Sequence, residues 1–362
     1  MTSDIFYAGI DLGSMNSAAV ASNSCRVFLP TTVGIPKDGL AATLLGDEPL
    51  VGEAIEQNKM ALKLVRPFQF GALKYGEQIA DPPAHALSYA KRVLRQLTQG
   101  LEIPDGQQVR CVMGAPSRSS LENKQTLLSV VREVLPTVAL VPEPFAVAYG
   151  LFSTARQALI IDVGAGTTDL CHYYGAFPRS DDQATLAVGG DRVDQWLTEL
   201  IMEEYPETEV TLETARVIKE MHGDLKSELG PCEVVLPTKD GESRAYDVSS
   251  ALAQSCRLFA DQLTLAVSDL LRQIPDHFRA EVLSNIVLAG GGSRLHGLGN
   301  ALERSCSCFG LCKVSAIYDS RFAGADGALK LAMRINDDTW SALTETTLSE
   351  ASPSQILPGA AA

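Results

Sequence analysis

The sequence predicts an α/β protein made of two domains that repeat the same series of elements. Apolar runs rich in β-branched residues alternate with segments of helical period, which is the pattern of an α/β fold. One series of strands and helices occurs twice along the chain, which indicates a duplication. The length of 362 residues also fits two domains, because a single core rarely grows beyond roughly 250–300 residues.

The first half begins with three consecutive strands. They are expected at residues 5–12, 17–22 and 25–29. After them we expect a helix at 84–99, a strand at 109–114, a helix at 120–134, a strand at 137–141 and a helix from Pro144. Residues 30–83, rich in Gly, Pro and Leu, form the expected insertion. The first domain therefore covers residues 1–150.

The second half repeats this order. Strands are expected at 157–163, 168–175 and 184–188, followed by a helix at 191–205, an insertion at 207–250, a long helix at 250–273, a strand at 284–289, a helix at 295–305, a strand at 312–317 and a helix at 322–335. The second domain covers residues 151–335. Residues 336–362 are expected to form a weakly ordered tail.

Composition excludes several classes of protein. The 44 acidic and 30 basic residues give a net charge of −14, which disfavours direct binding to nucleic acid or to an anionic membrane. No apolar run reaches the ~18 residues of a membrane span, and the N-terminus does not resemble a signal peptide. The eight scattered cysteines are typical of a reducing compartment. We therefore expect a cytoplasmic protein that does not insert into a membrane.

Three cysteines, Cys306, Cys308 and Cys312, form the one cluster in the sequence. They could supply thiolates to a metal ion. However, no fourth ligand is close in sequence, and structural zinc sites usually have paired cysteines two to four residues apart. The cluster favours no metal site.

The first motif whose residues could bind a ligand is Ile10–Ser17, between two predicted strands. Small residues let a hairpin backbone approach a phosphate, and Asp11 at a strand end could hold a hydrated Mg²⁺. The alternative is an ordinary hairpin that contains glycine. Taken alone, this motif favours the alternative.

The second motif, Ile161–Asp169, has the same form and also leads into a strand. Two such turns in equivalent halves could hold a polyphosphate from both sides, with Asp11 and Asp162 facing one cation. A Rossmann fingerprint fits poorly, because the glycines lead into a strand instead of a helix. A P-loop is excluded, since the chain has no Gly-Lys pair. Together the two turns favour phosphate binding.

The third motif follows the apolar strand Asn285–Ala289 and consists of Gly290–Arg294, with a helix expected to start near Leu295. Glycines at such a turn let a flat base or a phosphate lie against the backbone beside a helix N-terminus. Tight packing of strand against helix is the alternative. Its position after both hairpins favours a nucleotide.

The fourth motif is Val141–Ala146, in which prolines place Glu143 at the start of a helix. Glu143 could simply favour the helix dipole, or it could orient a water molecule for attack on a γ-phosphate. The residues alone do not decide between these two roles. Lys219 and Glu220 are, by themselves, an ordinary solvated pair on a helix.

These four motifs, in this order, resemble the superfamily of actins, heat-shock chaperones and sugar kinases over residues 5–335. Within it the chain resembles the bacterial actins. The closer resemblance rests on Val33–Asp38, Gly114–Arg118, Glu143–Leu151, Asp162–Cys171, Asn285–Arg294 and Gly327–Lys330. It implies an actin-like, ribonuclease H-like duplicated fold, with a nucleotide cleft between the two halves.

The resemblance also implies a role for each site residue. Asp11 and Asp162 would hold Mg²⁺ through water, and Glu143 with Thr167 would position the attacking water. The phosphates would lie against two sets of residues: Gly13, Ser14, Met15 and Asn16, and Gly164, Ala165, Gly166, Thr167 and Thr168. The ribose and adenine would contact a third set, Gly190, Asp191, Lys219, Glu220, Gly290, Gly291, Gly292, Ser293 and Arg294. Gly190 and Asp191 belong to the most variable of these motifs.

The implied function is an ATPase that polymerises into cytoskeletal filaments, with ATP or ADP and Mg²⁺ as cofactors and other copies of itself as partners. Such filaments position organelles such as magnetosomes, through cargo adaptors. A monomeric kinase, a cell-shape or plasmid-segregating actin, and a non-polymerising adaptor are the alternatives. The sequence offers no general base for a kinase and no amphipathic membrane anchor.

Overall fold

The computed structural model describes residues 5–69, 72–73, 83–117, 121–225 and 230–343. The chain forms two compact units. Unit 1 comprises residues 1–156, 173–179 and 319–362, and unit 2 comprises residues 157–172 and 180–318. The units differ from the predicted domains chiefly because the helix at Ala323–Arg334 (α11) belongs to unit 1, where it packs against β1 and α5.

Unit 1 contains a five-stranded sheet in the order β10-β9-β1-β2-β3. Its strands are β1 (Phe6–Leu12), β2 (Asn16–Ala21), β3 (Arg26–Pro30), β9 (Val109–Ala115) and β10 (Val138–Pro142). Strands β1, β9 and β10 are parallel, and β2 is antiparallel to both of its neighbours. The carboxyl ends of three strands therefore meet at one edge of this sheet.

The helices of unit 1 cover this sheet because successive residues of a strand face opposite sides. They are α3 (Pro83–Gln99), α4 (Leu121–Arg132), α5 (Glu143–Leu151) and α11. Ala8 and Ile10 of β1 join the buried cluster that includes residues of α3 and α4. Gly9, between them, lies against α11, where an added Cβ would be 2.2 Å from the Ala325 carbonyl oxygen. The sheet is thus packed on both faces.

The predicted insertion of the first half folds into its own small sheet, in the order β5-β4-β6. Its elements are β4 (Val33–Pro36), α1 (Gly39–Leu45), β5 (Leu50–Val51), α2 (Glu53–Asn58), a 3-10 turn (Lys59–Ala61) and β6 (Leu62–Val65). A short pair, β7 (Phe68–Gln69) and β8 (Ala72–Leu73), follows. Asp38 caps α1, since its carboxylate accepts a hydrogen bond of 2.8 Å from the Ala41 N–H.

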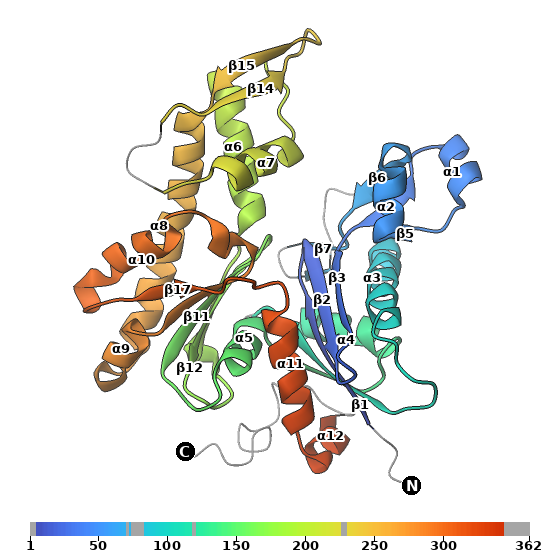
Figure 1. The fold of residues 1–362 in the computed structure, drawn as a ribbon, viewed down its shortest axis with the longest axis vertical. Coiled ribbons are helices and arrows are strands. Elements are labelled where there is room, and N and C mark those ends of the chain that lie inside the picture. The colour runs from blue at the N-terminus through green and yellow to red at the C-terminus, as the bar shows by residue number, and fades with distance from the viewer. Residues whose placement is uncertain (1–4, 70–71, 74–82, 118–120, 226–229, 344–362) are drawn as a thin grey trace. The chain divides into compact units, whose positions relative to one another are not determined.

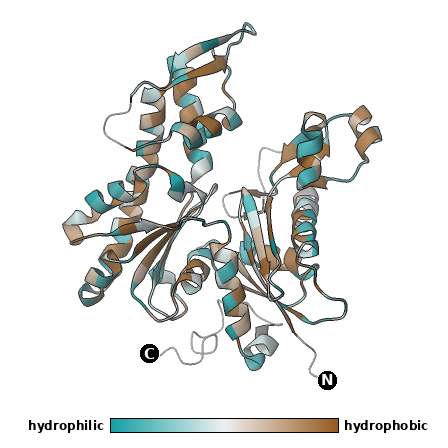
Figure 2. Cartoon of the chain, in the orientation of Figure 1, coloured by the Kyte–Doolittle hydropathy of each residue, from teal (hydrophilic) through white to brown (hydrophobic). Residues whose placement is uncertain are grey.

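Unit 2 contains a five-stranded sheet in the order β13-β12-β11-β16-β17 (Figure 1). It corresponds strand by strand to the sheet of unit 1 when that sheet is given in the direction β3-β2-β1-β9-β10. The strands are β11 (Ala158–Val163), β12 (Thr168–Tyr173), β13 (Gln183–Leu186), β16 (Ile286–Ala289) and β17 (Val314–Ala316). Strands β11, β16 and β17 are parallel, as are β1, β9 and β10 of the first sheet. The predicted duplication is therefore confirmed at the level of strand order. Figure 2 shows how apolar these strands are.

The helices of unit 2 are α6 (Gly190–Glu204), α8 (Ser249–Gln273), α9 (Asp276–Leu283) and α10 (Leu298–Cys306). The insertion contains α7 (Leu212–His222) and the hairpin of β14 (Glu233–Pro237) and β15 (Ser243–Asp247). Helix α6 contacts both α7 and α8. It begins directly after Gly189, so its first turn lies beside the second hairpin.

The structure corrects three expectations. Helix α9 was not predicted. The helix expected near Leu295 begins at Leu298, because Gly291–Arg294 forms a 3-10 turn before it. The tail is not entirely weakly ordered: Asp337–Leu343 form helix α12, and Trp340 is 1% exposed, with its Nε1 donating to the Ala332 carbonyl. Residues 344–362 of the predicted tail lie outside the described residues.

Among the residues that the structure describes, no helix has the length and hydropathy needed to cross a membrane. In the same described ranges, no group of three or more His, Cys, Asp or Glu side chains is arranged to hold a metal ion.

Candidate nucleotide site

The first hairpin connects β1 to β2, and glycine is required in it. Leu12 pairs with Ser17 at the base of the turn. A Cβ at Gly13 would be 2.5 Å from the Asn16 carbonyl oxygen, so no other residue fits this backbone. The turn is tied to the next segment by a hydrogen bond of 2.8 Å from the Thr31 N–H to the Met15 carbonyl. The hairpin is therefore fixed in shape.

Asp11 lies one residue before the end of β1, beside the start of α11. A Cβ at Gly324, the second residue of α11, would be 2.5 Å from the Asp11 Oδ2. Only glycine lets the helix approach this carboxylate so closely. Burial raises the pKa of Asp11 to about 6, because the charged form loses solvation. A negative charge held here is stabilised by a cation or by the helix N-terminus.

Glu143 is the first residue of α5 and follows β10 directly. A Cβ at Gly114 would be 2.9 Å from the Glu143 Cγ, so the missing side chain of Gly114 leaves room for the glutamate. Gly114 pairs with Val141 in the sheet. Because β1, β9 and β10 are parallel, Glu143 and Asp11 lie at the same edge of the sheet of unit 1.

The second hairpin connects β11 to β12 in unit 2. The Gly164 N–H donates a hydrogen bond of 2.9 Å to the Thr167 carbonyl, which closes the turn. Thr167 is 8% exposed. The Thr168 hydroxyl donates a hydrogen bond of 2.8 Å to the Val188 carbonyl, so its proton is already used within the fold. Any contact of residue 168 with a phosphate would therefore involve its backbone.

The Gly290–Arg294 turn lies on the end of β11. Gly290 has φ of +74°, and a Cβ there would be 2.3 Å from the Asp162 Oδ1 and 2.4 Å from the Val163 carbonyl oxygen. The Ser293 hydroxyl donates to the Gly290 carbonyl at 2.7 Å, so it closes the turn. Gly291 and Arg294 are exposed. The structure thus brings the third motif against Asp162.

We predict that Gly290→Ala destabilises the protein by about 2–3 kcal/mol or more, because the substitution adds both a strained φ and an overlap with backbone. Chemical denaturation would measure this loss. Gly291→Ala is the matched control, since a Cβ there meets nothing within 4 Å and its φ is not positive. Equal stability of the two variants would contradict the proposed packing of this turn.

Gly189–Asp191 joins the second hairpin to α6. The Gly190 N–H donates to the Gly164 carbonyl at 3.0 Å, and the Asp191 N–H donates to the Ala165 carbonyl at 2.8 Å. A Cβ at Gly189 would be 2.6 Å from the Gly164 carbonyl oxygen. The first turn of α6 and the hairpin therefore form one backbone unit.

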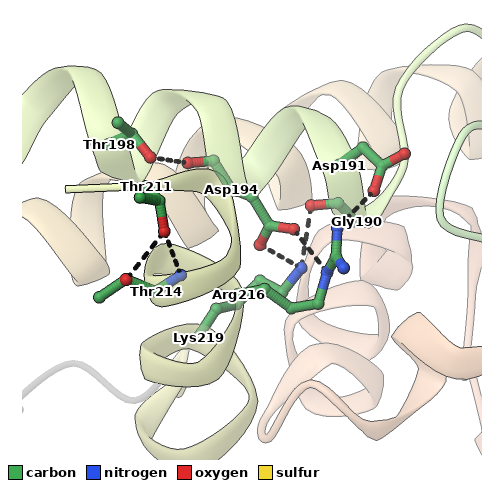
Figure 3. Close-up of polar contacts among 8 residues, drawn as sticks. All are labelled: Gly190, Asp191, Asp194, Thr198, Thr211, Thr214, Arg216 and Lys219. Atoms are coloured by element: carbon green, nitrogen blue, oxygen red, sulfur yellow. Dashed lines mark hydrogen bonds and ion pairs between the residues drawn. The ribbon is translucent and has the colours of Figure 1, made fainter. Parts of the chain in front are cut away.

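Lys219 is not the solvated residue that its sequence context suggests. Its Nζ donates to the Gly190 carbonyl at 2.9 Å and lies 2.6 Å from the Asp194 Oδ1 (Figure 3). Its side chain is 15% exposed. Glu220, in contrast, is exposed. Of the two neighbours, Lys219 therefore points into unit 2 and Glu220 faces solvent.

The predicted residues thus form two sets, one in each unit. Unit 1 holds Asp11, the first hairpin and Glu143. Unit 2 brings together Asp162, the second hairpin, the turns at Gly189–Asp191 and Gly290–Arg294, and Lys219. The sequence analysis gave no site role to four supporting residues, Gly114, Gly324, Asp194 and Arg216. The last two had a signal, because Asp191 and Asp194, like Arg216 and Lys219, are three residues apart on a helix.

Comparisons with known proteins identify the class to which this fold and these two hairpins belong. The model of the MreB/Mbl protein family matches residues 6–336. The chain therefore belongs to the MreB/Mbl family, and the predicted bacterial actin-like fold is confirmed.

Within this class the chain is similar to MamK. It is 32% identical over 343 residues to the actin-like protein MamK of Paramagnetospirillum magneticum, covering 94% of this chain and 96% of that protein. A structure of the MamK double helical filament matches with a TM-score of 0.85 and 32% identity, covering 92% of this chain and 100% of that one. The stretches on which the resemblance to bacterial actins rests also predict a particular likeness to MamK, and this identity confirms it.

Another solved structure that matches the chain is a non-polymerising point mutant of MamK bound to AMPPNP. It matches with a TM-score of 0.67 and 31% identity, covering 92% of this chain and 100% of that one.

Proposed function

We propose that the protein binds ATP through the paired hairpins of its two domains, hydrolyses it, and assembles with further copies of itself into a cytoskeletal filament. The observation that carries the proposal is the repeated Asp hairpin. In each unit an aspartate stands one residue before the end of the first strand and a glycine turn follows the strand. A second glycine packs against each carboxylate, Gly324 in unit 1 and Gly290 in unit 2. In each unit, an aspartate beside a glycine turn suits the binding of a phosphate together with a hydrated cation.

The residues also suit a hydrated Mg²⁺. The described residues contain no set of three acidic or His/Cys ligands, so a cation would need water and phosphate oxygens to complete its shell. Mg²⁺ commonly keeps several waters and is held by one or two carboxylates with substrate phosphates. Asp11 and Asp162 would supply those carboxylates, and the ion would neutralise charge on the phosphates.

In this proposal the backbones of residues 13–16 and 164–168 bind the phosphates. Gly190, Asp191, Lys219 and Glu220 lie near the ribose and adenine. Residues 290–294 face the adenosine. Glu143 with Thr167 orients the attacking water. The AMPPNP bound to the MamK mutant supports a nucleotide of this class.

The assembly of the MamK relative into a double helical filament supports self-association of this chain. A head-to-tail contact that does not close on itself generates a filament from one pair of subunit surfaces. We propose a cytoplasmic filament that positions an organelle, such as a magnetosome, through adaptor proteins. A monomeric kinase and a non-polymerising ATPase are the alternative outcomes.

Phosphate release from purified protein tests the enzymatic part of the proposal. We expect release with Mg²⁺ and ATP, and its loss when the cation is chelated. Release that is unaffected by chelation would contradict the role of Asp11 and Asp162. Electron microscopy of the same samples should show filaments, and a uniform field of monomers would favour the alternatives.

A further inference from the structure

Four charged side chains connect α6 to α7 in unit 2. Asp191 and Asp194 lie three residues apart on α6, and Arg216 and Lys219 lie three residues apart on α7, so each pair shares one face of its helix. The Arg216 Nε is 3.2 Å from the Asp194 Oδ2, and the Arg216 Nη2 is 3.2 Å from the Asp191 Oδ1. We call these four residues the charge quartet (Figure 3).

Asp194 is the centre of the charge quartet. It is 1% exposed and faces both cations, with Lys219 on Oδ1 and Arg216 on Oδ2. Burial raises the pKa of Asp194, and the neighbouring Lys219 and Arg216 oppose that rise. This carboxylate and the Gly190 carbonyl keep the Lys219 ammonium turned inward, although a lysine stem is flexible and its charge is strongly hydrated.

The charge quartet is linked to the phosphate-binding hairpin by short contacts. Asp194 forms an ion pair with Lys219, and the Lys219 Nζ donates a hydrogen bond of 2.9 Å to the Gly190 carbonyl. The N–H of the same Gly190 donates a hydrogen bond of 3.0 Å to the Gly164 carbonyl. The position of the hairpin backbone is thus coupled to a carboxylate that lies one turn into α6.

We propose that Asp194 is a positioning residue of the nucleotide site, which acts through Lys219 to hold the Gly189–Asp191 turn and the second hairpin in the arrangement that binds phosphate. This inference rests on the proposed nucleotide binding. Buried ion pairs contribute little net stability on average, so a role in fixing one geometry accounts for two buried aspartates that pair with two half-buried cations.

The test is a double-mutant cycle on ADP binding, measured by calorimetry with Mg²⁺ well below the melting temperature of each variant. Asp194→Asn should weaken ADP binding by about 10- to 100-fold, the range expected when a site is displaced by roughly 1 Å. Lys219→Met should also weaken it. The double variant should bind no more weakly than Lys219→Met, because Asp194 acts through the lysine.

Thr198→Ala is the matched control. Its hydroxyl, on the same helix, donates to the backbone carbonyl of Asp194 and not to the carboxylate. It should bind ADP as the wild type does. An affinity of Asp194→Asn within about twofold of the wild type, or additive losses in the double variant, would overturn the inference.

Failure of this inference is distinct from failure of the proposed function. Wild-type protein that binds no ADP would overturn the nucleotide site itself. If Asp194→Asn alone does not fold, Lys219→Met and the double variant, which removes one negative and one positive charge together, decide the question. A weaker affinity of Lys219→Met than of the wild type, with no further loss in the double variant, supports positioning through the lysine. Wild-type affinity of Lys219→Met, or a further loss in the double variant, contradicts it.

Discussion

Glu143→Gln should lower the rate of ATP turnover by about 10²- to 10⁴-fold while nucleotide affinity stays close to that of the wild type. Glutamine keeps the size of the side chain in the space above Gly114 but removes the carboxylate that would orient and deprotonate the attacking water. Because this water reacts only after ATP is bound, binding should not depend on the charge. Phosphate release under single-turnover conditions, together with nucleotide titration, would measure both quantities.

The control for this variant is Glu122→Gln. Glu122 is also an acidic residue in the first turn of a helix of unit 1, α4, and it is exposed. Its loss should cost only the small interaction with the helix dipole, about 0.3–1 kcal/mol of stability, with turnover unchanged. If Glu143→Gln also released phosphate at the wild-type rate, Glu143 would have only the same helix-start role.

The second large effect is expected for Gly327→Ala, at the crossing of α11 and α5 in unit 1. A Cβ at Gly327 would be 1.7 Å from the Ala146 carbonyl oxygen and 3.1 Å from the Gly150 nitrogen. Both contacts are with backbone, which has no rotamer that could move away. We expect a loss of about 3 kcal/mol or more in the free energy of unfolding.

The expected loss of stability in Gly327→Ala is opposite in sign to the usual effect of this substitution in a helix. In a helix interior, Gly→Ala normally stabilises by about 0.5–1 kcal/mol, because alanine loses less entropy on folding. Gly39→Ala, at the start of α1, has nothing within 4 Å of the added Cβ and serves as the control. Denaturant unfolding should therefore show a large loss of stability for Gly327→Ala and no loss for Gly39→Ala. A neutral Gly327→Ala would contradict the close crossing.

The sequence predicted most strands and hairpins because these elements depend on residues that are close together in the chain. The alternation in Phe6–Leu12 and the apolar run Ala158–Val163 specified two central strands, and their glycine turns specified two hairpins. The repeated series predicted that the two halves share one arrangement of elements, and the two sheets do share one strand order.

The missed features depend on residues distant in the chain. Helix α12 forms although its sequence is polar, because Trp340 is buried and donates to the Ala332 carbonyl. The charge quartet was missed because two ordinary helix pairs become one network only when α6 and α7 pack together. Gly324 had no signal of its own, since its requirement for glycine comes from Asp11, more than 300 residues earlier.

In the candidate site, the sequence motifs located both aspartates and both hairpins but not the way in which each side chain is used. The hydroxyls of Thr168 and Ser293 close backbone turns, and Lys219 holds the Gly190 carbonyl. These roles depend on which carbonyl lies within reach of each donor, and the chain reveals that only once it is folded. Which side chains contact a nucleotide stays a prediction.

Sedimentation of the purified protein tests the central proposal most directly. Samples at micromolar concentration would be centrifuged with Mg²⁺ and ATP, with Mg²⁺ and ADP, and without nucleotide. We predict that most of the protein pellets with ATP and stays in the supernatant without nucleotide. Protein that stays in the supernatant under all three conditions would contradict a nucleotide-dependent filament.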